Sequence, residues 1–500
     1  MNFYSVIENV VKLKPSNVAI KIGSEYTISY RQLGIQVSRY LNALSGLGVR
    51  SGDRVVVQVD KSLPSLLLYL ACLKGGYIFV PLNTAYKASE LNHFVADAEP
   101  ALFVTTTERF DEVFALVADV KTCSAVVLSG NDNHDLSSLS EGQPELAPTR
   151  ATDPGEVAVI IYTSGTTGRS KGAMVTHENL ISNVTELTRL WKFSECDALL
   201  HALPIFHVHG LFIANHCALT VGAKILWLDR FDIEEIAAAL PQATVMMGVP
   251  TFYTRLLKSA DFTKILCREM RLFISGSAPM LLETHKLFEK RTGHKILERY
   301  GMSEAGMITS NPYHGVRKVG TVGKALRGVS VRIVDDVDLN VTQGGTGHIQ
   351  IKGPNVFAGY RNMPKKTEEE FTPDGWFRTG DLGALDEEGY LTIVGRSKDL
   401  IITGGYNVYP KEIELVLDAD PRVLESAVFG IKHSDFGEAV TAAIVLNANS
   451  NLDTALLIEN IKTKLASYKV PKAIYVLDQL PRNAMGKVQK SLLREVYSSD

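Results

Sequence analysis

Short apolar runs alternate with longer amphipathic stretches in the first half of the chain, and this alternation constrains the fold more than any other feature. "DRVVVQV" precedes "PSLLLYLACLK", "VAVIIYTSG" precedes "HENLISNVTELTRLW", and "TVMMGV" precedes "PTFYTRLLK". Short buried runs that lead into helical stretches are typical of a layered α/β fold. Because 500 residues are too many for one hydrophobic core, we expect at least two domains.

The C-terminal part of the chain forms a pattern of its own after the turn-rich, charged stretch "TPDGWFRTGDLGALDEEGYLTIVGRSKD". We expect a helix to begin at Pro410, a strand to run through "LESAVFGI", and another helix to precede "YKVPKAIYVL". The sequence therefore predicts a large domain over residues 1–395 and a small α+β domain over residues 396–500. The connection is so short that it would act as a hinge.

Composition and charge argue against several classes of protein. The net charge is −3, which gives no general field for nucleic acid, and the five cysteines are scattered without the CxxC spacing of a zinc or disulfide framework. The apolar run "LLLYLACL" from Leu66 is too short to span a bilayer, and the N-terminus lacks a signal pattern. We expect a cytoplasmic protein without nucleic-acid or membrane partners.

The stretch "IIYTSGTTGRSKG", residues 160–172, is a candidate phosphate-binding loop. From Thr163 to Ser170, seven of eight residues are Gly, Ser or Thr. Glycines let backbone N–H groups converge on an anion, hydroxyls add donors, and Lys171 adds charge. Gly172 follows the lysine, where a Walker A loop requires Ser or Thr. From composition alone, a flexible loop that ends in a lysine is an equal alternative.

Five stretches in this order resemble the adenylate-forming enzymes, which include acyl-CoA synthetases, peptide-synthetase adenylation domains and firefly luciferase. They are the loop above, "YGMSEAG", "GWFRTGDLG", "GRSKDLIITGGYNVYPKEIE" and "PRNAMGKVQK". The resemblance covers essentially the whole chain. It implies a large N-terminal domain of βα layers with a barrel-like part, followed by a small mobile α+β domain.

The resemblance also implies a reaction. An acid takes AMP from ATP with the help of Mg²⁺, pyrophosphate leaves, and the thiol of coenzyme A then displaces AMP. Residues that match the family's motifs are the phosphate-binding Thr163, Ser164, Thr166, Thr167 and Lys171, the adenosine-binding Tyr300, Ser277, Asp381 and Arg396, the metal-binding and catalytic Glu304, the catalytic Lys487, the hinge residue Lys398, and Gly404 and Gly405 for the coenzyme A step. Taken singly, such an aspartate is more often a turn-former and such a lysine a surface residue.

Arg299 stands immediately before Tyr300, where a pocket for fatty or aromatic acids would be apolar or small. A buried unpaired guanidinium is unfavourable, so an inward-facing arginine needs an anion, and its planar fork suits a carboxylate. Since the reacting carboxylate faces ATP, Arg299 indicates a second one, as in a short dicarboxylic acid. The alternative is an internal ion pair, for instance with Glu298.

Further stretches favour malonate as the acid. "ALPIFHVHGLF", "ATVMMGVPTFYTRLL", "LFISGSAPM" and "IKGPNVFAGY" resemble the branch of the family that activates malonate. Methylmalonate or oxalate, and a carrier protein in place of coenzyme A, remain alternatives, as does a non-catalytic nucleotide sensor. Acetylation of Lys487 by a lysine acetyltransferase would remove its charge. Candidate residues of the acid pocket are Arg299, His207, Thr251, Ser277, Val208 and Met307, although His207 or His209 could equally be core histidines.

Overall fold

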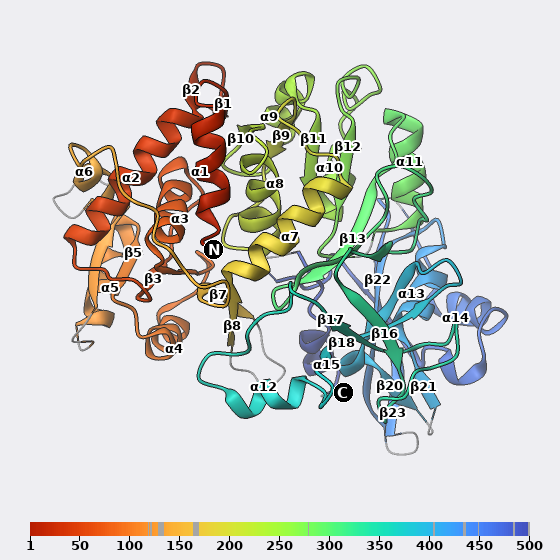
Figure 1. Ribbon diagram of the computed structural model, residues 1–500. Helices are drawn as coiled ribbons and strands as arrows, with labels where there is room; N and C mark the ends of the chain where they lie inside the picture. The colour runs from red at the N-terminus through yellow and green to blue at the C-terminus, as the bar shows by residue number, and fades with distance from the viewer. Residues whose placement is uncertain are drawn as a thin grey trace.

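The computed structural model places an α/β N-terminal part beside a smaller C-terminal part (Figure 1). It describes residues 1–118, 120, 123–128, 135–163, 170–278, 280–403, 406–433, 437–448, 450–483 and 486–498. In the view of Figure 1, the red and orange elements form the left side, the green elements lie at the upper centre and right, and the blue C-terminal elements lie at the lower right.

A six-stranded sheet carries the first part of the chain. Its strands lie in the order β6-β5-β3-β4-β7-β8, and all neighbouring pairs are parallel except β7 and β8. Strands rich in valine and isoleucine suit a sheet that is buried on both faces. The bounds are β3 (Arg54–Val57), β4 (Ile78–Pro81), β5 (Leu102–Thr105), β6 (Ser124–Val127), β7 (Val157–Thr163) and β8 (Lys171–Thr176), with α4 (Ala88–Ala98), α5 (Phe110–Val117) and α6 (Leu136–Ser140).

A nine-stranded sheet follows, in the order β15-β14-β13-β12-β11-β9-β10-β1-β2. Its centre, from β13 to β1, is parallel. The strands are β1 (Val18–Ile22), β2 (Tyr26–Ser29), β9 (Ala198–His201), β10 (Lys224–Trp227), β11 (Val245–Gly248), β12 (Leu272–Ser275), β13 (Leu297–Met302), β14 (Gly306–Ser310) and β15 (Lys324–Ala325). The helices associated with it are α7 (His177–Leu190), α8 (Asn215–Leu219), α9 (Ile233–Ala239), α10 (Pro250–Leu256) and α11 (Leu282–Thr292).

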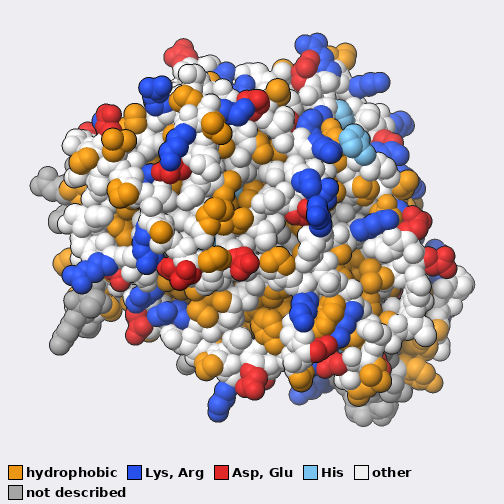
Figure 2. Space-filling model, in the orientation of Figure 1, with side chains coloured by type: hydrophobic (Ala, Val, Ile, Leu, Met, Phe, Trp, Pro, Cys, Tyr) orange, Lys and Arg blue, Asp and Glu red, His pale blue; other side chains and the backbone are white. Residues whose placement is uncertain are grey.

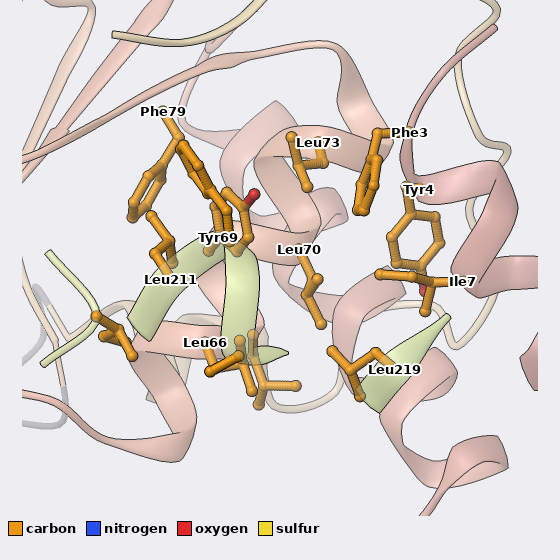
Figure 3. Packing of buried hydrophobic residues seen from close by; sticks show 14 of the residues in the cluster. Phe3, Tyr4, Ile7, Leu66, Tyr69, Leu70, Leu73, Phe79, Leu211 and Leu219 are labelled. Atoms are coloured by element: carbon orange, nitrogen blue, oxygen red, sulfur yellow. The ribbon is translucent and has the colours of Figure 1, made fainter. Parts of the chain in front are cut away.

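The largest core cluster joins the two sheets through the helices between them. Every residue of α3 (Leu63–Gly75) from Leu66 to Leu73 is buried, as expected for a helix that is apolar on all sides. Figure 3 shows Leu70 and Leu73 near side chains of α1 (Tyr4–Leu13), and Tyr69 on the other side near Phe79 and Leu211. The longest apolar run of the sequence is therefore a core helix, which α2 (Tyr30–Gly46) covers on another side.

Antiparallel sheets make up the rest of the chain. The first, in the order β16-β17-β18-β19, corresponds to the barrel-like part that the resemblance implied; its elements are β16 (Ser330–Val334), β17 (Gly347–Lys352), α12 (Pro364–Glu370), β18 (Phe377–Leu385) and β19 (Leu391–Arg396). The second forms the C-terminal α+β part, with β24 parallel to β23; its elements are β20 (Ile401–Thr403), β21 (Tyr406–Val408), α13 (Pro410–Asp418), β22 (Val423–His433), β23 (Gly437–Leu446), α14 (Thr454–Lys462), β24 (Ala473–Leu477) and α15 (Lys490–Tyr497).

Most of the predicted elements are present, with one difference in connection. A helix begins at Pro410, a strand covers "LESAVFGI", and α14 precedes "YKVPKAIYVL". Between β7 and α7, however, the chain forms the additional strand β8, which pairs antiparallel with β7. Basic, acidic and apolar side chains are interspersed on the face shown in Figure 2. Among the described residues, no helix combines the length and the apolar character needed to cross a membrane.

Candidate active site

Three segments that follow neighbouring strands of the nine-stranded sheet carry candidate residues of the site. His207 to His209 follow β9, Thr251 follows β11, and Gly276 and Ser277 follow β12. The carboxyl ends of parallel strands meet at one edge of a sheet, where ligands bind in open α/β folds. These residues, separated by long stretches of sequence, are therefore brought to one edge by the parallel arrangement of the strands.

Arg299 on β13 is 3% exposed, and its Nε and Nη2 atoms have no hydrogen-bond partner. Desolvation lowers the pKa of Arg299 to about 10. No carboxylate within the described ranges forms an ion pair with it. Glu298 faces the other side of the strand, where its carboxylate lies 2.8 Å from His285 Nε2 on α11. The internal ion pair with Glu298 is therefore not formed, and the guanidinium retains free donors in a buried place.

The backbone after β12 makes room for this arginine. A Cβ atom on Gly276 would lie 2.4 Å from the guanidinium carbon of Arg299, so only glycine fits there. The next residue, Ser277, has a φ of 74°, in the left-handed region that side chains other than glycine rarely adopt. Such strained residues cluster at functional sites because the surrounding structure imposes them. The Gly276–Ser277 turn thus lets the backbone contact the flat face of the guanidinium.

Two histidines face the same region without hydrogen-bond partners. Nε2 of His207 and both ring nitrogens of His209 are buried and unpartnered. Desolvation, together with the charge of Lys487, lowers the pKa of His207 to about 3, and desolvation together with the charge of Arg299 lowers the pKa of His209 well below its usual value. The lowered pKa values indicate neutral rings at neutral pH. Their buried, unpartnered nitrogens can bind a ligand, His209 near Arg299 and His207 near Lys487. Among the described residues, these nitrogens lack the hydrogen-bond partners that a satisfied core histidine would have.

Two apolar candidates also lie in the core beside this region. Val208 is 8% exposed and Met307 is 2% exposed, and both belong to the cluster that joins the two sheets. The terminal methyl group of Met307 would lie 2.5 Å from a Cβ atom on Gly301, so the methionine packs against the backbone of β13. Asn183 on α7 fixes Met307 by hydrogen bonds of 3.1 and 2.8 Å to its N–H and carbonyl groups.

Glu304 lies in the turn between β13 and β14, buried to 7% exposure. Its Oε1 atom accepts hydrogen bonds from Tyr360 Oη at 3.1 Å and Thr163 Oγ1 at 3.4 Å. Desolvation raises the pKa of Glu304, whereas the Tyr360 hydroxyl and the charge of Lys171 oppose this shift. Lys171 Nζ lies 4.1 Å from the centre of the Tyr360 ring and 3.6 Å from Glu370 Oε1. The loop lysine and the predicted metal carboxylate thus share Tyr360.

Asp381 on β18 connects two of the residues predicted to bind adenosine. It accepts a 2.5 Å hydrogen bond from Tyr300 Oη and lies 3.1 Å from Arg396 Nε. Asp381 and Arg396 are register partners on β18 and β19. The carboxylate is 5% exposed, and its charge raises the pKa of Arg396. Residues from two different sheets are therefore held together by one carboxylate.

Lys487 extends from the C-terminal part toward these N-terminal residues. Desolvation lowers its pKa, and so do the charges of Arg396 and Arg299, while those of Asp381 and Glu304 oppose the shift. The Lys487 side chain nevertheless keeps solvent access, so water moderates this effect. A Cβ atom on the preceding Gly486 would lie 4.0 Å from Thr251 Oγ1. The loop that carries Lys487 thus rests against the segment after β11.

Several predicted residues lie elsewhere. Ser164, Thr166, Thr167, Gly404 and Gly405 lie outside the described residues. Lys398 lies in the short helical turn Ser397–Asp399, between the two antiparallel sheets. Sequence reasoning missed Gly276 and Tyr360 as site residues. A glycine or a tyrosine carries no chemical signal by itself, although "LFISGSAPM" contains Gly276 and "IKGPNVFAGY" contains Tyr360.

Glu304 is the residue of this site that could hold Mg²⁺. Within the described part of the chain, no three His, Cys, Asp or Glu side chains lie close enough together to hold a metal ion. Magnesium commonly uses one or two carboxylates and takes its other ligands from water and substrate phosphates. A single buried carboxylate, Glu304, beside the end of the phosphate loop fits that pattern.

Two family profiles match the chain in succession. The AMP-binding enzyme profile matches residues 7–361, and the profile of the AMP-binding enzyme C-terminal domain matches residues 412–487. The chain belongs to the AMP-binding enzyme family. Its fold and its conversion of acids through ATP and coenzyme A are those of this family, which is the adenylate-forming family that the motifs indicated.

Individual family members are also similar. A malonate–CoA ligase of Arabidopsis thaliana is 35% identical over 491 residues, which cover 90% of this chain and 79% of the plant protein. The ATP-bound structure of MatB from Rhodopseudomonas palustris is 47% identical, covers 99% of both chains and superposes with a TM-score of 0.96. The apo structure of that protein, with the same identity and coverage, gives 0.86. The arrangement of the parts in this AMP-binding enzyme therefore resembles the ATP-bound form.

Proposed function

We propose that the protein is an ATP-dependent malonate–CoA ligase that forms malonyl-CoA, AMP and pyrophosphate through a malonyl-adenylate. The observation that carries this proposal is Arg299, a buried guanidinium with two unpartnered nitrogens at the edge of the sheet where the site lies. A monocarboxylic acid would leave that charge without a counterion. Similarity to malonate–CoA ligases supports the same substrate.

The chemistry proceeds in two steps. One carboxylate oxygen of malonate attacks the α-phosphorus of ATP, the bond to the bridging oxygen of pyrophosphate breaks, and malonyl-adenylate forms. The sulfur of coenzyme A then attacks the acyl carbon, the bond to the AMP oxygen breaks, and the thiol proton passes to solvent. Positioning and charge neutralisation dominate the first step, because phosphoryl oxygens and a carboxylate repel each other.

Lys487 neutralises the charge that builds between the incoming carboxylate and the α-phosphate. The charges of Arg396, Asp381, Arg299 and Glu304 act on its ammonium group, which supports a place for Lys487 between the proposed acid pocket and the proposed nucleotide site. A cation there is complementary to the transition state. Lys487 is therefore the catalytic residue of the adenylation step.

The nucleotide is held by residues around Asp381. Its carboxylate accepts the ribose hydroxyls with Arg396 beside it, Tyr300 lies on the adenine, and Ser277 contacts the adenosine. Thr163, Ser164, Thr166, Thr167 and Lys171 hold the phosphates. Glu304 would hold Mg²⁺, which when bound neutralises phosphate charge. The protein's own part is to keep that carboxylate buried and oriented by Tyr360 and Thr163.

The distal carboxylate of malonate binds Arg299. Its free Nε and Nη2 atoms offer two parallel donors, as a carboxylate requires. The neutral His207 and the hydroxyl of Thr251 complete the polar wall. Val208 and Met307 limit the space around C2 of the acid, so a small substituent such as the methyl group of methylmalonate can be accepted.

Domain movement separates the two steps. We place the boundary at Gly395-Arg396, with residues 1–395 and 396–500 as the two domains and Lys398 as the hinge. Lys487 must leave before the thiol enters, and Gly404 and Gly405 then approach the coenzyme A arm. Acetylation of Lys487 by a lysine acetyltransferase would remove the charge and stop adenylation. A cytoplasmic location remains the prediction of the sequence.

A substrate panel tests the proposal. Purified enzyme is given ATP, Mg²⁺ and coenzyme A with acetate, oxalate, malonate, methylmalonate, succinate or coumarate, and AMP is measured. Malonate is expected to give the highest kcat/KM. Higher values for acetate or coumarate would overturn the role of Arg299, and a preference for oxalate would favour the shorter diacid. Pyrophosphate release without coenzyme A, and product formation with a carrier protein, identify the acceptor.

A further inference from the structure

Lys61 is a lysine whose ammonium group points into the protein without a carboxylate within ion-pair distance among the described residues. Its Nζ atom donates to the carbonyl of Leu228 at 2.6 Å and to the carbonyl of His201 at 2.8 Å, and it lies 3.1 Å from His201 Nδ1. It also lies 4.4 Å from the centre of the Trp227 ring. Three acceptors match the three hydrogens of a lysine ammonium group. The side chain is therefore fully satisfied, and it holds the end of β9.

His201 links Lys61 to the part of the chain that follows β9. Its Nε2 atom lies 3.0 Å from the carbonyl oxygen of Gly210. A carbonyl only accepts, so Nε2 carries the proton and Nδ1 accepts from Lys61. Desolvation and the charge of Lys61 lower the pKa of His201 well below its usual value, which keeps the ring neutral and in this tautomer. The result is a continuous chain from Lys61 through His201 to Gly210.

Gly210 belongs to the π-helical segment His209–Ala214, an unusual conformation that is frequent at functional sites. A Cβ atom on Gly210 would lie 2.0 Å from the carbonyl oxygen of Pro204, so the segment folds back tightly on itself. The carbonyl of Gly210 also accepts from Asn215 Nδ2 at 3.0 Å. Hydrogen bonds from His201 and Asn215 to this carbonyl therefore anchor the segment that begins with His209.

This anchoring of the backbone matters because the histidine rings at the start of the segment, His209 and the nearby His207, are not held by hydrogen bonds of their buried nitrogens. His207 Nε2 and both ring nitrogens of His209 lack partners, so no hydrogen bond of these atoms fixes the orientation of the rings toward Arg299. Their placement depends on the backbone. Lys61, between β3 of the six-stranded sheet and α3, reaches across to the nine-stranded sheet to provide that anchor.

We propose that Lys61, acting through the neutral His201 ring, is a positioning residue that sets His207 and His209 opposite Arg299 and thereby determines affinity for the acid. The inference rests on the proposed function, because it takes the region around Arg299 as the acid pocket. It concerns the acid side of the site alone, since Glu304, Asp381 and Lys171 are held by other contacts.

The test compares Lys61→Met with a matched control. Methionine keeps the length of the side chain but cannot donate. Lys74→Met is the control, because Lys74 is buried on α3, the helix that follows Lys61, but it is paired with Glu8 at 3.0 Å and lies over the Tyr4 ring. Lys61→Met is expected to raise the KM for malonate about tenfold or more, a size typical of lost supporting contacts around a site, while the KM for ATP changes less than about twofold. Lys74→Met is expected to lower Tm and leave both KM values unchanged.

A second pair of variants tests the intermediate ring and does not depend on the folding of Lys61→Met. His201→Gln retains a donor for Gly210 and an acceptor for Lys61. It is expected to keep the malonate KM within a few-fold of wild type, which is roughly the effect of weakening one hydrogen bond. His201→Phe retains only the ring shape and is expected to behave like Lys61→Met. An unchanged malonate KM in His201→Phe, or a parallel rise of the malonate and ATP values, overturns the inference. If wild type prefers another acid, the same comparison is made with that acid, so the proposed function can fail alone.

Discussion

Replacement of Arg299 by methionine should impair the use of the acid without destabilising the fold. Methionine retains the unbranched stem that packs beside Gly276 but carries no charge. Loss of one partner of a desolvated charge pair costs on the order of 2–5 kcal/mol, and 1.4 kcal/mol corresponds to tenfold in binding. We therefore expect Arg299→Met to lower kcat/KM for malonate by at least about a hundredfold, with little change in the affinity for ATP.

Stability of the free enzyme is expected to change in the opposite direction. Burial lowers the pKa of Arg299 from its usual value to about 10, and a shift of this size corresponds to a cost on the order of 3 kcal/mol for keeping the folded side chain charged. The folded-state pKa lies below the unfolded one, so this cost is present in full at neutral pH and fades only as the pH rises above about 10. Without malonate, Arg299→Met should thus melt at the same temperature as wild type or higher.

Two assays test this. AMP release from ATP is measured against malonate concentration, and thermal unfolding is measured with and without malonate in the presence of a non-hydrolysable ATP analogue. Wild type should be stabilised by malonate, and the variant should not. Arg54→Met is the control. Within the described ranges, the Arg54 side chain donates to the carbonyls of Gly52, Ala98 and Glu99, far along the chain from the site, so its loss should lower Tm and spare malonate kinetics. Unchanged malonate turnover in Arg299→Met, or a fall in its Tm like that of the control, would refute the reasoning.

Three further predictions concern other parts of the site. Lys487→Ala should abolish pyrophosphate release from ATP and malonate but leave thioester formation from supplied malonyl-adenylate largely intact; equal loss of both half-reactions would contradict its role. Replacement of both Val208 and Met307 by alanine should admit ethylmalonate, as measured by the ratio of kcat/KM for ethylmalonate to that for malonate, and an unchanged ratio would count against their placement. Glu304→Gln should abolish activity but raise Tm at neutral pH, because the folded-state pKa of Glu304 is raised and its charged form is therefore costly above that pKa. This gain in Tm should shrink as the pH falls toward the usual pKa range of a glutamate. A gain that stays constant with pH would disprove the linkage.

Local patterns in the sequence predicted the elements well wherever one short stretch decides the structure. Pro410 begins α13 because proline suits a first helical turn, and the run around Leu66 forms a buried helix because it is apolar on all sides. Strand β8 was not predicted. Its residues Lys171–Thr176 are too few to show a period, and they become a strand because β7 offers them a partner.

The supporting residues of the site could not be predicted for a related reason. Tyr360 supports the site because it contacts Glu304 and Lys171. Lys61 does so because it contacts His201, which lies 140 positions away in the chain. Each of these residue types is common on its own. A contact between distant residues depends on how two sheets are placed, and no local pattern records that placement.

Arg299 shows which part of the site the sequence determines and which part the tertiary structure determines. Its chemical type and its place beside the motif that contains Glu304 are written in the sequence, and together they already indicate a carboxylate-binding site. Whether the protein itself neutralises that charge was decided by the tertiary structure alone. Neighbouring residues of a strand face opposite sides of the sheet, so Glu298 is directed to His285 on α11. On the side of Arg299, Gly276 and His209 lie near the guanidinium, and no carboxylate of the described residues pairs with it.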